Sequence, residues 1–166
     1  MLEAARAVAK NKYQIIVAAA PGIDDSFYQT YLENEILTRN PYATLAQAKA
    51  AVVNSGTATL ETALIGCPQT AVYHVAGSKY LEKFLRPIMF SIPNFTLVNI
   101  ISKQEIIQEL IASRFTQENV TNELQRLLHD NAYREQMQAN YLHLWNILGN
   151  NSASETAAEQ IITTVN

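Results

Sequence analysis

The sequence predicts an α/β fold in which a parallel sheet is flanked by helices and followed by a helical carboxyl-terminal segment. Three short apolar runs, at residues 13–20, 50–53 and 69–75, have the continuous hydrophobicity of strands buried on both faces of a sheet. Helical patterns alternate with these runs, which implies right-handed crossovers and parallel pairing. Glycine and proline punctuate the elements, as with Pro21 and Gly22 after the first run and Gly66 and Pro68 after a helix at residues 57–65.

The other elements follow in order along the chain. We expect an amphipathic helix at residues 1–10, a helix that Asp25 or Ser26 caps and that runs to about residue 35, and one or two helical turns within 44–49. Beyond the third strand we expect an amphipathic segment at 78–89, an irregular stretch at 90–101, and a helix at 102–113. The apolar stripe of that last helix consists of Ile106, Ile107, Leu110 and Ile111. The remainder is expected to be helical: a helix that Thr116 caps and that runs through residue 128, a helix at 131–148, and a last helix that a Ser152-x-x-Glu155 capping box opens and that runs to 165.

Length and composition indicate one domain over residues 1–166, with residues 116–166 as its helical extension. Apolar residues make up 48% and charged residues 16% of the 166 residues, as in an ordinary α/β domain. The net charge of -3 argues against a nucleic-acid partner, because no basic excess exists to neutralise phosphates. The single cysteine, Cys67, excludes an internal disulfide and is expected to be a buried apolar residue.

The sequence is not expected to contain a membrane-spanning helix or, in its opening residues, a signal peptide. No apolar run approaches the roughly 20 residues that a membrane-spanning helix needs. Glu3, Arg6 and Lys10 lie within the opening helix and argue against a signal peptide. Because the chain opens within a helix, without a capping residue or a strand before it, we expect it to be part of a longer protein.

The turn at residues 54–57 is the main candidate for a binding site. It joins a buried strand to a helix at the carboxyl edge of a parallel sheet, which is where open α/β folds bind ligands. Gly56 lets the backbone approach an anion, and the first turn of the helix offers unpaired N–H groups and a positive dipole end. Ser55, Thr57 and Thr59 add hydroxyl donors, and Glu61 can accept two hydrogen bonds from a diol such as ribose.

A simpler interpretation of this turn remains open on the residues alone. Ser-Gly-Thr is also an ordinary helix cap, and Glu61 is also a favourable partner for a helix dipole. The turn matches neither the dinucleotide fingerprint nor the P-loop motif. Asp24 and Asp25, the only adjacent carboxylates, are typical of a turn and helix start, so no metal or other cofactor is expected. The histidines lack a paired nucleophile and are expected to be structural: His74, His129 and His143.

A basic, apolar segment follows the third strand. Lys79, Lys83 and Arg86 recur at helical spacing among aromatic and aliphatic residues. Such a pattern suits an anionic membrane surface. A core helix with a solvated basic face would have the same pattern.

Several short blocks of sequence resemble the lipid-A-disaccharide synthase family, which belongs to the two-domain GT-B glycosyltransferases. The blocks occur in the family's order within residues 13–130, at 55–61, 66–68, 72–73, 97–101, 105–110 and 116–119. The resemblance implies a Rossmann-like donor-binding domain at the carboxyl-terminal side of a GT-B enzyme. Two departures accompany it, because the family's first strand with its Gly-Ser-Arg turn and the amino-terminal acceptor domain are not in this chain. The catalytic base is expected in that missing domain, so the chain alone should bind nucleotide weakly and catalyse nothing.

The resemblance also implies a reaction and its partners. The family transfers the sugar of UDP-2,3-diacylglucosamine to an acylated glucosamine 1-phosphate, forming the β-1,6 disaccharide of lipid A. Ser55, Gly56 and Thr57 then contact the diphosphate and Glu61 the ribose, while Asn99 and Glu109 lie near the donor. The family is cytoplasmic and peripheral on the inner face of the bacterial inner membrane, and a homo-oligomer is compatible with it. A UDP-N-acetylglucosamine 2-epimerase-like enzyme and a non-catalytic nucleotide-binding module are the alternatives.

Overall fold

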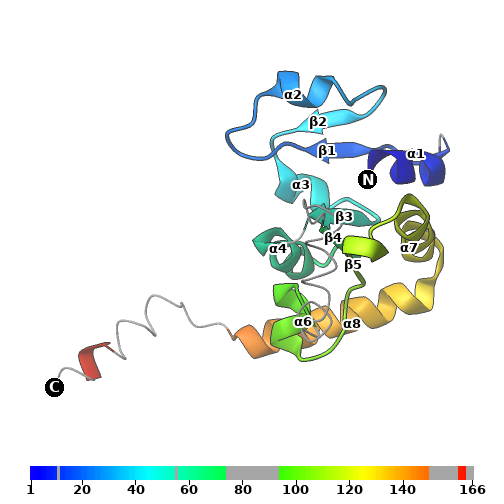
Figure 1. Cartoon of the computed structure of the whole chain (residues 1–166). Helices are drawn as coiled ribbons and strands as arrows, with labels where there is room; N and C mark the ends of the chain where they lie inside the picture. The colour runs from blue at the N-terminus through cyan, green and yellow to red at the C-terminus, as the bar shows by residue number, and fades with distance from the viewer. Residues whose placement is uncertain (11, 55, 74–93, 150–160, 164–166) are drawn as a thin grey trace.

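A computed structural model describes residues 1–10, 12–54, 56–73, 94–149 and 161–163. Figure 1 shows these elements stacked from β1, β2 and α2 at one end to α6 and α8 at the other. In chain order they are α1 Leu2–Ala9, β1 Ile16–Ala18, α2 Asp25–Gln29, β2 Ile36–Thr38, α3 Pro41–Leu45, β3 Ala51–Asn54, α4 Thr57–Ile65, β4 Gln69–Tyr73, α6 Leu97–Ser102, β5 Glu109–Ile111, the 3-10 helix Ala112–Arg114, α7 Gln117–His129 and α8 Asn131–Leu148.

The described strands are all parallel, which confirms the predicted α/β class. They form two sheets, one with the order β1-β2 and the other with the order β3-β4-β5. In the larger sheet Ala51 pairs with Gln69, and Ala71 pairs with Glu109. Helices flank this sheet, with α4 and α7 on opposite sides of it in Figure 1. The carboxyl ends of its strands therefore lie at one edge, next to the start of α4.

The first predicted strand is shorter and more exposed than the sequence suggested. β1 covers three residues, and Ile16 remains 43% exposed, so the expectation of burial on both faces was wrong. The helix expected to reach about residue 35 ends at Gln29, and a second strand, β2, follows instead. Among the described strands, β1 and β2 pair only with each other, and both contain exposed residues.

A salt bridge joins the opening helix to the segment before β2. Arg6 on α1 donates from Nε and Nη2 to the two carboxylate oxygens of Glu35, at 2.7 and 3.1 Å. It also donates to the carbonyl of Tyr31 at 2.8 Å. These hydrogen bonds to Arg6 lower the pKa of Glu35 from 4.5 to about 2.

The segment at residues 102–113 does not form the predicted helix; it contains a turn, the short strand β5 and the start of a 3-10 helix. The four apolar residues of the expected stripe are buried, but Glu109–Ile111 forms β5 and pairs with β4. Before it, α6 covers Leu97–Ser102, where we expected irregular structure. The side chain of Asn99 explains the difference, because its Oδ1 accepts from the backbone N–H of Ile106 and Ile107 and so replaces helical bonds at that point.

The later helices agree with the sequence. α4 and α8 have the predicted bounds, and α7 begins after its predicted cap Thr116 but ends one residue later than expected. Gly66 ends α4 in the left-handed conformation with φ 88°. Thr116 caps α7 by accepting from the N–H of Asn119 at 3.1 Å. The expected segments at 78–89 and 152–165 lie outside the described residues, apart from 161–163.

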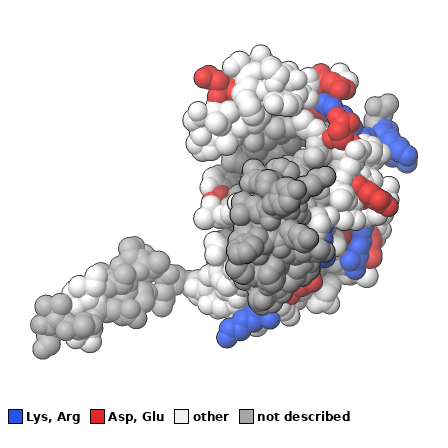
Figure 2. All heavy atoms as spheres, in the orientation of Figure 1, with Lys and Arg blue, Asp and Glu red and all other residues white. Residues whose placement is uncertain are grey.

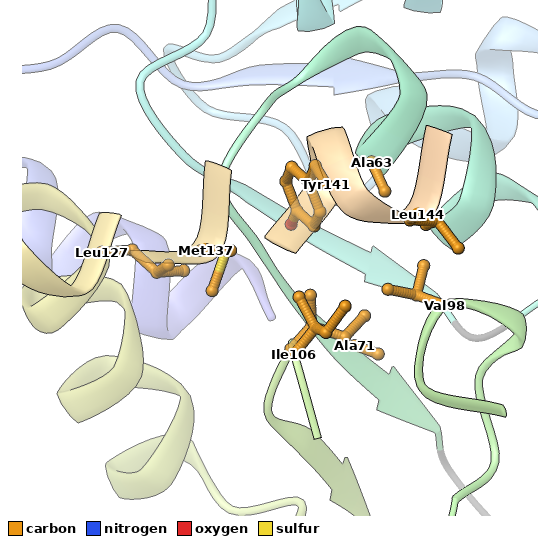
Figure 3. Close-up of a cluster of buried hydrophobic side chains, with 9 residues drawn as sticks. Ala63, Ala71, Val98, Ile106, Leu127, Met137, Tyr141 and Leu144 are labelled. Atoms are coloured by element: carbon orange, nitrogen blue, oxygen red, sulfur yellow. The ribbon is translucent and has the colours of Figure 1, made fainter. Parts of the chain in front are cut away.

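Two groups of buried apolar side chains form the core. In the first, α4, β4, α6, α7 and α8 meet around Tyr141 and Leu144 of α8 (Figure 3). The second packs α1 against β4, β5 and α7. A buried polar pair also joins α7 to α8, because Tyr133 donates to Glu123 at 2.7 Å. Burial raises the pKa of both groups, and Glu123 is 4% exposed.

Candidate functional site

The start of α4 follows the carboxyl end of β3 at the edge of the larger sheet. β3 ends at Asn54, and Gly56 is the N-cap residue of α4, with φ 148° and ψ -160°. Only glycine adopts this conformation without strain. No side chain caps α4. Side chains do cap four other described helices: Asn40 for α3, Thr96 for α6, Thr116 for α7 and Asp130 for α8.

One face of α4 presents the predicted contact residues to solvent. Gly56, Thr57 and Glu61 are exposed, and Thr57 and Glu61 share a helix face because they are four residues apart. Thr59 points inward, is fully buried, and donates from Oγ1 to the carbonyl of Gly56 at 2.8 Å. Its hydroxyl therefore supports the turn from inside the fold. Ser55 lies outside the described residues.

The carboxylate of Glu61 has a neighbour that the sequence did not indicate. The hydroxyl of Tyr42, on α3, donates to Oε2 of Glu61 at 3.1 Å. This hydrogen bond raises the pKa of Tyr42, because the neutral phenol is the donor to the carboxylate. Within the described part of the chain no other hydrogen bond reaches Glu61, and the residue is exposed. Nineteen residues separate the two side chains, and no local pattern signals their contact.

Asn99 and Glu109 are brought together in a buried polar network. Asn99 is fully buried and Glu109 is 7% exposed. Nδ2 of Asn99 donates to the carbonyl of Ile107 and to Oε1 of Glu109, both at 2.9 Å. The carboxylate of Glu109 also accepts from the backbone N–H of Phe95 and Thr96 and from the hydroxyl of Thr96 at 2.8 Å.

This network fixes the start of α6 against the start of β5. Both donor hydrogens of the Asn99 amide are used, and its oxygen accepts from Ile106 and Ile107. Thr96 is the N-cap residue of α6 and also binds Glu109. Asn99 therefore has no hydrogen-bonding capacity left for a ligand in this arrangement.

The remaining candidates have ordinary structural surroundings. Asp25 begins α2 and forms an ion pair with Arg39, as expected of a turn and helix start. Cys67 is buried, and burial raises the pKa of its thiol to about 11. His129 on α7 lies 6.3 Å from the ring of Tyr13, and His143 is exposed on α8. His74 and the basic residues Lys79, Lys83 and Arg86 lie outside the described residues.

Three further properties of the described residues concern surface charge, membrane-spanning helices and metal-ligating side chains. Along the right edge of the face in Figure 2, the acidic and basic side chains of the described residues lie interspersed. Among the described residues, no helix has the length and apolarity to span a bilayer. The same residues contain no group of three or more His, Cys, Asp or Glu side chains placed to hold a metal ion.

Parallel strands, crossover helices and an uncapped helix terminus after β3 define the class of the protein. It is a Rossmann-like α/β domain of the GT-B type. A family model described as "Lipid-A-disaccharide synthetase" matches residues 8–162. The chain belongs to that family.

Individual relatives agree with the family match. The chain is 32% identical over 177 residues to a lipid-A-disaccharide synthase of Syntrophus aciditrophicus, and the aligned region covers 99% of this chain and 44% of the relative. It is 34% identical over 131 residues to the enzyme of Koribacter versatilis, covering 76% of the chain and 34% of the relative. For the enzyme of Myxococcus xanthus the identity is 29% over 170 residues, with 98% and 43% covered. The chain thus spans less than half the length of these relatives.

Proposed function

We propose that this chain is the donor-binding part of a lipid-A-disaccharide synthase and that the start of α4 binds the UDP moiety of UDP-2,3-diacylglucosamine. The observation that carries the proposal is the exposed face formed by Gly56, Thr57 and Glu61 above an uncapped helix terminus. It lies at the carboxyl edge of the β3-β4-β5 sheet, where ligands of open α/β folds bind. The family match favours the synthase over the 2-epimerase and the non-catalytic module.

In this proposal the helix terminus stabilises the leaving diphosphate. Transfer of the sugar breaks its bond to UDP, and negative charge grows on the diphosphate oxygens. The N–H groups in the first turn of α4 hold fixed positions before reaction, so they stabilise that charge with little reorganisation, and the hydroxyls of Ser55 and Thr57 are further donors by sequence. Glu61 stands one turn further along the same face and accepts hydrogen bonds from the ribose diol.

Other predicted site residues take indirect roles in the proposal. Thr59 supports the turn through the Gly56 carbonyl, and Asn99 with Glu109 holds α6, which packs against α4. The acylated glucosamine 1-phosphate acceptor and the catalytic base belong to the part of the enzyme outside this chain. Membrane contact by Lys79, Lys83 and Arg86, at the cytoplasmic face of the inner membrane, rests on their sequence pattern alone.

Titration with UDP tests the nucleotide site directly. We expect the full chain to bind UDP and Glu61→Ala to bind it about 10- to 100-fold more weakly, because two hydrogen bonds to a charged acceptor are lost. Isothermal calorimetry would measure both dissociation constants. The matched control is Glu135→Ala, which removes an exposed glutamate from α8 and should leave UDP binding unchanged.

Two results would contradict the proposal. Equal affinities for the wild-type chain and Glu61→Ala would remove the ribose assignment. A complete lack of UDP binding by a folded wild-type chain would remove the nucleotide site itself.

A further inference from the structure

We propose that Tyr42 is a positioning residue that holds the Glu61 carboxylate in the orientation needed to accept a ribose diol. The inference rests on the proposed function, since it concerns the same nucleotide site. Its starting point is the hydrogen bond of 3.1 Å from the Tyr42 hydroxyl to Oε2 of Glu61. Neither the family resemblance nor any sequence motif points to Tyr42.

The short helix α3 gives Tyr42 a defined position. Asn40 caps α3 by accepting from the N–H of Ala43 at 3.2 Å, and Pro41 restricts the backbone of the first helical residue. The hydroxyl of Thr44 donates to the carbonyl of Asn40 at 2.9 Å. α3 packs against α4, so the phenol projects from a constrained turn toward the exposed face of its neighbour.

Glu61 needs such a partner because it is exposed. A glutamate on an open helix face samples many rotamers, and binding a diol in one geometry costs the entropy of ordering that side chain. A hydrogen bond to one oxygen before the ligand arrives reduces that cost. Tyr42 donates only to Oε2, so Oε1 and a second lone pair on Oε2 stay available for the two hydroxyls of the diol.

The arrangement also distinguishes a positioning role from a general structural one. Tyr42 is 56% exposed and does not belong to either core cluster, so its hydroxyl contributes little to folding. If the Tyr42 hydroxyl acts through Glu61, removing that hydroxyl should weaken binding only of ligands that possess the diol. Removing the hydroxyl should also weaken binding only in a chain that has a glutamate at position 61.

The test compares UDP with 2′,3′-dideoxy-UDP, which lacks both hydroxyls of the diol. For Tyr42→Phe in the full chain, calorimetry should give a UDP affinity about three- to ten-fold weaker than wild type, as for loss of one hydrogen bond. The affinity for the dideoxy ligand should be unchanged. In the Glu61→Gln background, adding Tyr42→Phe should have no further effect on UDP binding.

The control and the contrary outcomes separate this inference from the proposed function. Tyr31→Phe removes another exposed phenol, 58% exposed, and should bind UDP as the wild type does. Equal UDP affinities for Tyr42→Phe and wild type, or an equal loss for both ligands, would overturn the positioning role while leaving the nucleotide site intact. If Glu61→Gln itself leaves UDP affinity unchanged, the ribose assignment fails and the inference about Tyr42 fails with it.

Discussion

Replacing Asn99 with aspartate should destabilise the folded chain by about 3–5 kcal/mol near neutral pH. The substitution keeps the oxygen that accepts from the N–H groups of Ile106 and Ile107 at 2.8 and 3.1 Å. It removes the amide that donates to the carbonyl of Ile107 and to Oε1 of Glu109, both at 2.9 Å. The lost bond to the carbonyl is worth about 1 kcal/mol and the bond to the carboxylate about 1.5–3 kcal/mol, and two buried carboxylates then repel each other.

The loss of stability in Asn99→Asp should depend on pH. In the unfolded chain the new aspartate ionises near its ordinary pKa of about 3.9. In the folded chain Glu109 and burial raise the pKa of that aspartate, so the difference in stability grows as the pH rises above about 4. Near pH ~4 a protonated aspartate can instead donate to Glu109, and the loss should shrink to about 1–2 kcal/mol.

Urea unfolding of the wild type and the variant over this pH range would measure the effect. Asn122→Asp is the matched control, because it introduces the same charge at an exposed position on α7. A destabilisation below about 1 kcal/mol near neutral pH, or one that does not depend on pH, would refute the proposed network. It would mean that Asn99 and Glu109 are not paired in a buried site.

Three further predictions follow from other contacts. Because Arg6 lowers the pKa of Glu35 from 4.5 to about 2, the stability from this pair is complete above pH 4.5 and is lost as the pH falls toward 2. In Glu35→Gln the thermal unfolding midpoint should therefore fall less steeply than in the wild type as the pH is lowered from 4.5 toward 2. An unchanged pH dependence of the midpoint would contradict the pairing. Tyr133→Phe should cost about 1–3 kcal/mol in urea unfolding, because it leaves the buried Glu123 without its donor. Gly56→Ala should cost about 1–3 kcal/mol, because alanine is strained at φ 148°, and a variant as stable as wild type would show that the turn adopts another conformation.

The candidate site was predictable in part, because its local features are encoded locally. The turn after β3, the helix at 57–65 and its end at Gly66 follow from residues within a few positions of each other. Strand β2 and the helix α6 were missed because their sequences carry no clear local signal. The error at 102–113 has the same origin, because isoleucines buried in a strand can match a helical stripe when the segment is short.

Contacts between distant residues required the tertiary structure. Sequence placed Thr59, Asn99 and Glu109 among the candidate ligand contacts, whereas the fold buries all three. It also brings Tyr42 onto Glu61 across nineteen residues, a relation that no spacing rule contains.

The sequence by itself determined the α/β class and the family, and it predicted an anion site at the turn before α4, because strand hydrophobicity, capping residues and the ordered blocks are local properties. Only the tertiary structure decided which polar side chains of that region face solvent and which are buried and hydrogen-bonded to other residues. The physical reason is that hydrogen-bonding capacity depends on burial and on partners from other elements. Asn99 and Glu61 are both polar residues near helix starts. Packing engages all the amide groups of Asn99 in hydrogen bonds, whereas Glu61 is exposed and has Tyr42 as its partner among the described residues.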